Sequence, residues 1–236
     1  MIQLFNVIFY QPLLNLLIFI YNIIPYHDLG WAIIIITVII RLLLFPFSAK
    51  SIKAQRALQE LQPKISELKE KFKNDKQAQA TATMKLYKEN KINPLSSCLP
   101  LLIQFPFLIA IYQVFMVGLS NGNLDLLYPF IQNPGQINTL AFGFLDLSKP
   151  LIILALITGL VQFWQNKMIM STKRPAVKGQ GSKDEDMMAI MNSQMIYLMP
   201  IMTAVIGFGL PSGLVLYWLV LTILTGLQQM WTLRKK

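Results

Sequence analysis

A single arginine, Arg41, lies inside the apolar stretch that runs from Leu29 to Ser48. An ionised side chain at the centre of an inserted helix costs about 2.5–3.5 kcal/mol, so such residues usually have a function. At about 1.5 Å of rise per residue, Arg41 lies roughly 10 Å from the inner end of this stretch and roughly 18 Å from its outer end. The charge is therefore predicted to lie in the inner half of the bilayer.

Two interpretations of Arg41 follow from this depth. The side chain could extend toward the cytoplasmic headgroups, or it could face a water-filled cavity between helices. Thr37, one helical turn earlier, would share the face of Arg41. Three glutamines in other apolar stretches could line the same cavity: Gln104, Gln162 and Gln228. No carboxylate falls between Leu29 and Ser48 or in the other predicted spans, so a counter-charge for Arg41 could come from outside the protein.

The composition indicates a membrane protein. Hydrophobic residues make up 54% of the chain and charged residues 14%, whereas soluble domains carry about 25% charged residues. The single cysteine, Cys98, excludes an internal disulfide, and the single histidine, His27, argues against a histidine metal site. The sequence shows neither a phosphate-binding glycine loop nor a nucleophile–base pair. We therefore expect no enzyme activity, no cofactor and no metal.

The positive charge is concentrated in three segments. Eleven basic residues lie between Lys50 and Lys91, five between Lys167 and Lys183, and three in the tail Arg234–Lys236. If these segments face the cytoplasm, the chain satisfies the positive-inside rule. The net charge of +10 is then mostly a topology signal, and no direct role in nucleic-acid binding is expected.

The predicted fold is an all-α membrane protein with a core of five transmembrane helices. The predicted spans are residues 28–49, 93–117, 150–167, 189–210 and 211–231. The predicted connections are a cytoplasmic segment at 50–92, an outer loop at 118–149, a cytoplasmic loop at 168–188 and a basic tail at 232–236.

Residues 1–27 precede the first predicted span. Gln11, Asn15 and Asn22 fall on one helical face of this otherwise apolar segment. A narrow polar stripe of this kind is typical of an amphipathic helix lying in the membrane interface. A membrane span is the alternative.

Residues 50–92 are polar and helical in pattern. Apolar residues recur at spacings of three and four, as in a heptad seam: Leu58, Leu61, Ile65, Leu68 and Phe72. Pro63 interrupts this seam and predicts a kink or a new helix start. Asn74-Asp75 predicts a turn, and a second, smaller apolar face follows. We therefore expect an antiparallel helical hairpin that projects into the cytoplasm.

Four segments, in order along the chain, resemble the YidC family of membrane protein insertases. They are IIIITVIIRLLLFP (Ile33–Pro46), LQPKISELKEKF (Leu61–Phe72), LYKENKINPLSSCLPLLIQFPFLIAIY (Leu86–Tyr112) and LPSGLVLYW (Leu210–Trp218). The resemblance implies a five-helix core around a hydrophilic groove, an interfacial helix formed by the first apolar segment, and a mobile cytoplasmic hairpin. It also implies groove or substrate-contact positions at Arg41, Thr37, Gln104, Tyr217 and Trp218, with Gln162 as a further candidate.

The resemblance also implies a function and its partners. The clients would be nascent membrane proteins with short acidic outer segments, inserted without nucleotide hydrolysis into the bacterial plasma membrane. Further implied partners are membrane lipids, the ribosome, the signal recognition machinery and the Sec translocon. The residues alone leave open an alternative, in which Arg41 is the substrate site of a secondary transporter or an anion channel.

Overall fold

A computed structural model describes residues 2–93, 99–118, 124, 126–169 and 194–234, and the chain is mostly helical. The helices are α1 (Ile2–Phe5), η1 (Asn6–Tyr10), α2 (Gln11–Ile23), η2 (Pro25–His27), α3 (Leu29–Leu43), α4 (Phe45–Lys71), α5 (Lys76–Glu89), α6 (Leu99–Gln113), η4 (Val114–Gly118), α7 (Ile152–Ile169), η5 (Gln194–Leu198), α9 (Met199–Gly207) and α10 (Ser212–Arg234). Two short antiparallel strands, β1 (Leu140–Ala141) and β2 (Leu145–Asp146), lie in the predicted outer loop. Residues 170–188 of the predicted cytoplasmic loop and residues 189–193 of the predicted fourth span lie outside the described residues.

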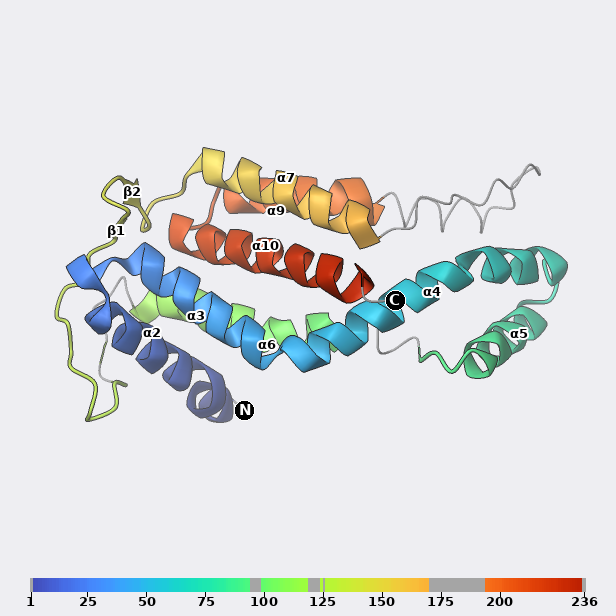
Figure 1. Ribbon diagram of the computed structural model, residues 1–236, viewed down its shortest axis with the longest axis horizontal. Coiled ribbons are helices and arrows are strands. Elements are labelled where there is room, and N and C mark those ends of the chain that lie inside the picture. The colour runs from blue at the N-terminus through green and yellow to red at the C-terminus, as the bar shows by residue number, and fades with distance from the viewer. Residues whose placement is uncertain (1, 94–98, 119–123, 125, 170–193, 235–236) are drawn as a thin grey trace.

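Helix α10 is the central element of the bundle. It packs against α3 on one side and α7 on the other, and α7 in turn packs against α9 (Figure 1). Close approach is possible because α10 carries Gly226, beside the ring of Trp164 on α7. Tyr217, a fully buried side chain of the core, also belongs to α10.

Two described helical segments are long and apolar enough to cross a membrane by themselves, Gln3–Ile23 and Ser212–Arg234. A third candidate is the bent pair Leu29–Leu43 and Phe45–Leu68. Gln104–Met116 and Ile196–Gly207 are shorter apolar helices. The structure thus supports a helical membrane protein, while the core of five spans stays a prediction.

The first predicted span bends at its inner end. Helix α3 ends at Leu43, and α4 begins at Phe45 at an angle of 68° to α3. Pro46 lies in the first turn of α4, where its missing N–H breaks the hydrogen-bond pattern that would have continued α3. The residues from Phe45 onward therefore leave the bundle in a new direction.

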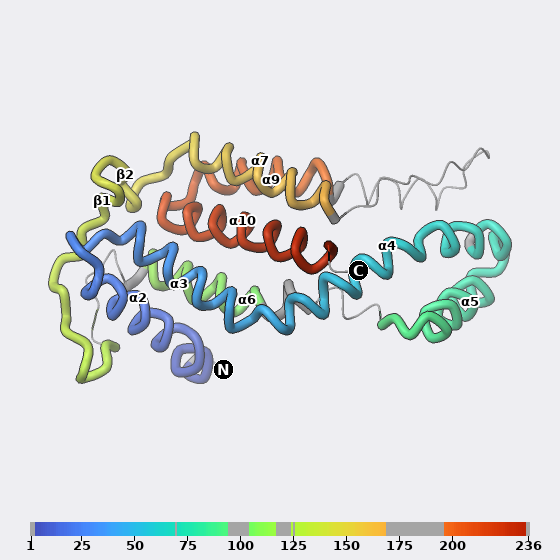
Figure 2. Tube along the Cα trace, viewed as in Figure 1, coloured from blue at the N-terminus to red at the C-terminus, as the bar shows by residue number. Residues whose placement is uncertain are grey.

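The helical hairpin is formed by α4 and α5, which pack against each other and project away from the bundle (Figure 1). Figure 2 shows the chain passing from α3 through α4 to the tip of this hairpin. Asp75 is the N-cap of α5. Its carboxylate accepts hydrogen bonds from the backbone N–H groups of Gln77 and Ala78. No new helix begins at Pro63, since α4 continues through it to Lys71.

The N-terminal end of α3 is fixed by Asp28. One carboxylate oxygen accepts hydrogen bonds from the N–H groups of Gly30 and Trp31, which caps the helix. The other oxygen accepts a hydrogen bond of 2.6 Å from the N–H group of Phe142 in the outer loop. Asp28 therefore joins the start of α3 to the β1–β2 turn.

Replacing Gly30 with alanine is expected to destabilise the protein by about 1–3 kcal/mol. The added Cβ atom would lie 2.7 Å from the Cβ atom of Ala141 and 2.7 Å from a ring carbon of Phe142. Thermal unfolding in detergent would measure the effect. Gly209→Ala is the matched control, because the nearest atom to its new Cβ is 3.9 Å away. Equal melting temperatures for the two variants would contradict this close packing.

Candidate functional site

Arg41 lies near the inner end of α3 and is half-buried. Its Nε atom is buried and has no hydrogen-bond partner. Within the described ranges, no carboxylate lies at ion-pair distance from Arg41. No acidic side chain in the described part of the chain therefore balances the charge of Arg41. The sequence already showed that the predicted spans contain no carboxylate.

A hydrogen bond beside Arg41 joins two further helices. The Nε2 atom of Gln104, on α6, donates to the hydroxyl oxygen of Tyr217, on α10, over 2.7 Å. The side chain of Arg41 lies near that of the same tyrosine. Three helices from distant parts of the sequence thus bring Arg41, Gln104 and Tyr217 together.

The position of Tyr217 bears on the direction of the arginine side chain. Tyr217 lies five residues after the first residue of α10, whereas Arg41 lies two residues before the last residue of α3. An arginine whose side chain lies near this tyrosine extends into the bundle. The geometry therefore favours the interior interpretation over extension toward the cytoplasmic headgroups.

The other predicted site residues are placed differently. Thr37 is fully buried, and its hydroxyl donates to the backbone oxygen of Ile33 over 2.6 Å, so it is satisfied within α3. Trp218 follows Tyr217 on α10 and is half-buried. Gln162 lies on α7, with its Oε1 atom buried and unpartnered. Helix α7 packs against α10 and α9, whereas α3, which carries Arg41, packs against another side of α10 (Figure 1).

A second polar group lies near the C-terminal end of α10. The Nε2 atom of Gln228 donates to the backbone oxygen of Phe45 over 3.0 Å, at the first residue of α4. Gln229 and Thr232 are also buried, and each of the three has a side-chain oxygen without a partner. Sequence reasoning noticed Gln228 but missed Gln229 and Thr232, although a Gln-Gln pair in an apolar helix was a usable signal.

A small void adjoins Tyr217. Its volume is about 10 Å³. It is lined by Leu13, Leu17, Ile33, Ile36, Ile111, Val114, Phe115 and Tyr217. An ordered water requires two to four polar partners, which this lining does not offer. We therefore interpret it as a packing defect and not as a binding site.

The polar stripe of α2 faces the predicted outer loop. The side-chain amides of Gln11 and Asn15 both donate to the backbone oxygen of Leu126, and Asn15 also accepts from the N–H group of Tyr128. Asn22 donates to the backbone oxygen of Gln132. The stripe that the sequence suggested for the membrane interface thus binds the backbone of the chain's own loop.

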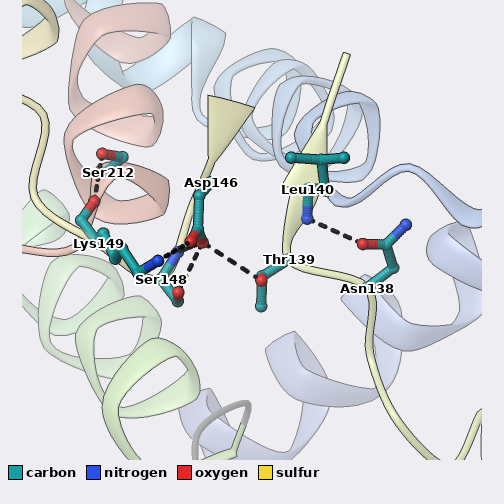
Figure 3. Close-up of polar contacts among 7 residues, drawn as sticks. All are labelled: Asn138, Thr139, Leu140, Asp146, Ser148, Lys149 and Ser212. Carbon is teal, nitrogen blue, oxygen red and sulfur yellow. Dashed lines mark hydrogen bonds and ion pairs between the residues drawn. The ribbon is translucent and has the colours of Figure 1, made fainter. Parts of the chain in front are cut away.

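Asp146 organises the turn between β2 and α7 (Figure 3). One of its oxygens accepts from the N–H and hydroxyl groups of Ser148 and from Thr139, and the other pairs with Lys149 at 3.1 Å. The backbone oxygen of Lys149 accepts from Ser212 at the start of α10. The hydrogen bonds from Ser148, and then Lys149, lower the pKa of Asp146 from 3.8 to about 2.

This lowered pKa predicts how the turn responds to acid. A carboxyl group with a depressed pKa stabilises the folded state above its unfolded pKa and loses that effect as the pH falls through its folded pKa. The melting-temperature difference between the wild type and Asp146→Asn is therefore expected to be constant above about pH 4 and to shrink toward about pH 2. Thermal unfolding across this range would measure it, and a difference that grew on acidification would contradict the assignment.

The apolar helices and the buried polar cluster define a helical membrane protein, and the comparisons with known proteins identify its family. The sequence model described as "60Kd inner membrane protein" matches residues 19–236. A membrane protein insertase YidC of Fusobacterium nucleatum is 33% identical over 208 residues, covering 88% of this chain and 87% of that protein. The YidC of Geotalea uraniireducens is 38% identical over 221 residues, covering 93% of this chain. This chain belongs to the YidC family.

The matches also show how much of each relative the chain represents. It spans 36% of the length of the Geotalea uraniireducens protein. A crystal structure of an active YidC insertase, with its first transmembrane domain resolved, has a TM-score of 0.59 and 24% identity. That match covers 94% of this chain and 45% of the solved chain. The structural likeness therefore shows a shared fold.

Proposed function

We propose that this chain is a membrane protein insertase that acts through a hydrated, positively charged groove in the plasma membrane. The observation that carries the proposal is Arg41. It is half-buried among apolar helices and has no carboxylate partner in the described part of the chain. It also lies near Tyr217, which accepts a hydrogen bond from Gln104. A charge placed in this way suits a partner that binds transiently.

The proposed mechanism requires no chemical step. The hydrophilic outer segment of a client must cross about 30 Å of hydrocarbon, and a groove reaching part of the way would shorten that path. Arg41 would attract acidic residues of the segment, because charges interact strongly where the effective dielectric constant is low. The apolar helix of the client would then move into lipid, which gains about 25 cal/mol for each Å² removed from water.

The remaining predicted residues have supporting roles in this proposal. Tyr217 and Trp218 would contact the client, while Thr37 would support the helix that carries Arg41. Gln162 would belong to a separate polar position on α7. The proposed topology places the α4–α5 hairpin and the C-terminus in the cytoplasm, as the distribution of basic residues predicts.

The partners belong to the same proposal. The clients would be nascent membrane proteins with short acidic outer segments, and the ribosome, the signal recognition machinery and the Sec translocon would be further partners. The relatives reported above are insertases. They give no support to the alternative of a transporter or anion channel.

Reconstitution tests the proposal directly. Liposomes containing the purified protein should insert a small single-span client in the absence of nucleotide, and the inserted segment should be protected from added protease. Empty liposomes and liposomes with an unrelated membrane protein are the controls. Insertion no greater than in the controls would rule out the proposal.

A further inference from the structure

The β1–β2 turn carries a group of aromatic side chains at the outer end of α3. The ring of Trp31 contacts that of Phe142 at 5.6 Å, and Phe142 approaches Phe144 at 6.4 Å. Phe144 is 80% exposed and Trp31 is 52% exposed. We call Trp31, Phe142 and Phe144 the outer aromatic patch.

The fold holds this patch firmly in its exposed position. Phe142 and Gly143 both have positive φ angles, as a tight turn between paired strands requires. The N–H group of Phe142 donates to Asp28, and the neighbouring Ala141 is fully buried against the bundle. Phe144 is thus presented outward by an ordered turn.

The patch continues an apolar surface of the bundle. Trp31, Ile35 and Leu42 are exposed on α3, and their spacings of four and seven place them on one helical face. In a membrane protein such a face contacts lipid. Trp31 stands at its outer end, where aromatic residues are enriched at the boundary between hydrocarbon and water.

The charges near the patch are already engaged. Both carboxylate oxygens of Asp28 accept backbone hydrogen bonds, and Asp146 pairs with Lys149. The turn therefore presents mainly aromatic surface, with little charge to resist entry into the interfacial layer.

We propose that the β1–β2 turn is a membrane anchor, in which Phe144 and Trp31 insert into the boundary between headgroups and acyl chains of the outer leaflet. The partner is the phospholipid bilayer itself. Through Phe142 and Asp28, this anchor would fix the depth of the outer end of α3. The anchor does not depend on the proposed insertase activity.

Spin labelling of the full chain in lipid vesicles tests the anchor. In a Cys98→Ser background, the Phe144→Cys variant carries a nitroxide, and the matched control carries it at the exposed loop position Gln136. The vesicles contain phosphatidylcholine and phosphatidylglycerol. Collisions with oxygen, which concentrates in lipid, are compared with collisions with a water-soluble nickel chelate.

The expected result is a label at position 144 that favours oxygen over the nickel chelate, with the reverse preference at position 136. The same preference for the nickel chelate at both positions would overturn the proposal. A label at position 144 that is shielded from the nickel chelate only at a high protein-to-lipid ratio would also overturn the proposal. The shielding would then come from a second copy of the chain and not from lipid.

Discussion

Arg41→Ala is expected to reduce insertion of a client with an acidic outer segment at least about tenfold in reconstituted liposomes. Two unit charges 4 Å apart interact by about 4 kcal/mol at an effective dielectric constant of 20, and about 1.4 kcal/mol corresponds to a factor of ten. Partial exposure of the arginine weakens this attraction, so a tenfold loss is the conservative expectation. The protease-protected fraction of client measures it.

Two matched comparisons separate charge from packing. Arg41→Lys keeps the positive charge and is expected to retain more insertion than Arg41→Ala. A client whose acidic residues are replaced by neutral ones should respond much less to either change. Equal insertion by the wild type, Arg41→Lys and Arg41→Ala would show that the charge of Arg41 is dispensable.

The features of this fold that could be predicted from the sequence are those set by residues close together along the chain. Heptad spacing and the Asn74-Asp75 turn predicted the helical hairpin, and Asp75 caps α5 at that turn. Arg41 was conspicuous because it is one charge in a long apolar stretch. The role given to Tyr217 came from family resemblance, since one tyrosine in an apolar helix carries no such signal.

Other features depend on contacts between distant residues. The polar stripe of α2 could face water, lipid headgroups or protein with the same helical spacing. Its partners lie more than one hundred residues away, at Leu126, Tyr128 and Gln132. Likewise, the hydrogen bond from Gln228 to the backbone oxygen of Phe45 lies at the 68° bend between α3 and α4 and joins residues 183 positions apart, so only the packed structure reveals it.

The same contacts make Asn15 the residue of the stripe with the largest predicted effect on stability. Asn15 is 2% exposed, and its side chain pairs with both the backbone oxygen of Leu126 and the N–H group of Tyr128. Asn15→Ala would leave the N–H group of Tyr128 without its partner, at a cost of about 1–3 kcal/mol where it stays buried, whereas the backbone oxygen of Leu126 would keep its hydrogen bond from Gln11. For a chain of this size we expect the melting temperature to fall by roughly 2–12 °C.

Asn22→Ala is the matched control for this prediction. Asn22 makes one hydrogen bond, to the backbone oxygen of Gln132, in an exposed setting where water can replace it. Its loss should cost less than about 1 kcal/mol. Asn15→Asp should not restore stability at neutral pH, because a carboxylate can accept from Tyr128 but cannot donate to Leu126. Similar melting temperatures for Asn15→Ala and Asn22→Ala, measured in the same detergent, would mean that the outer loop is held mainly by its apolar contacts.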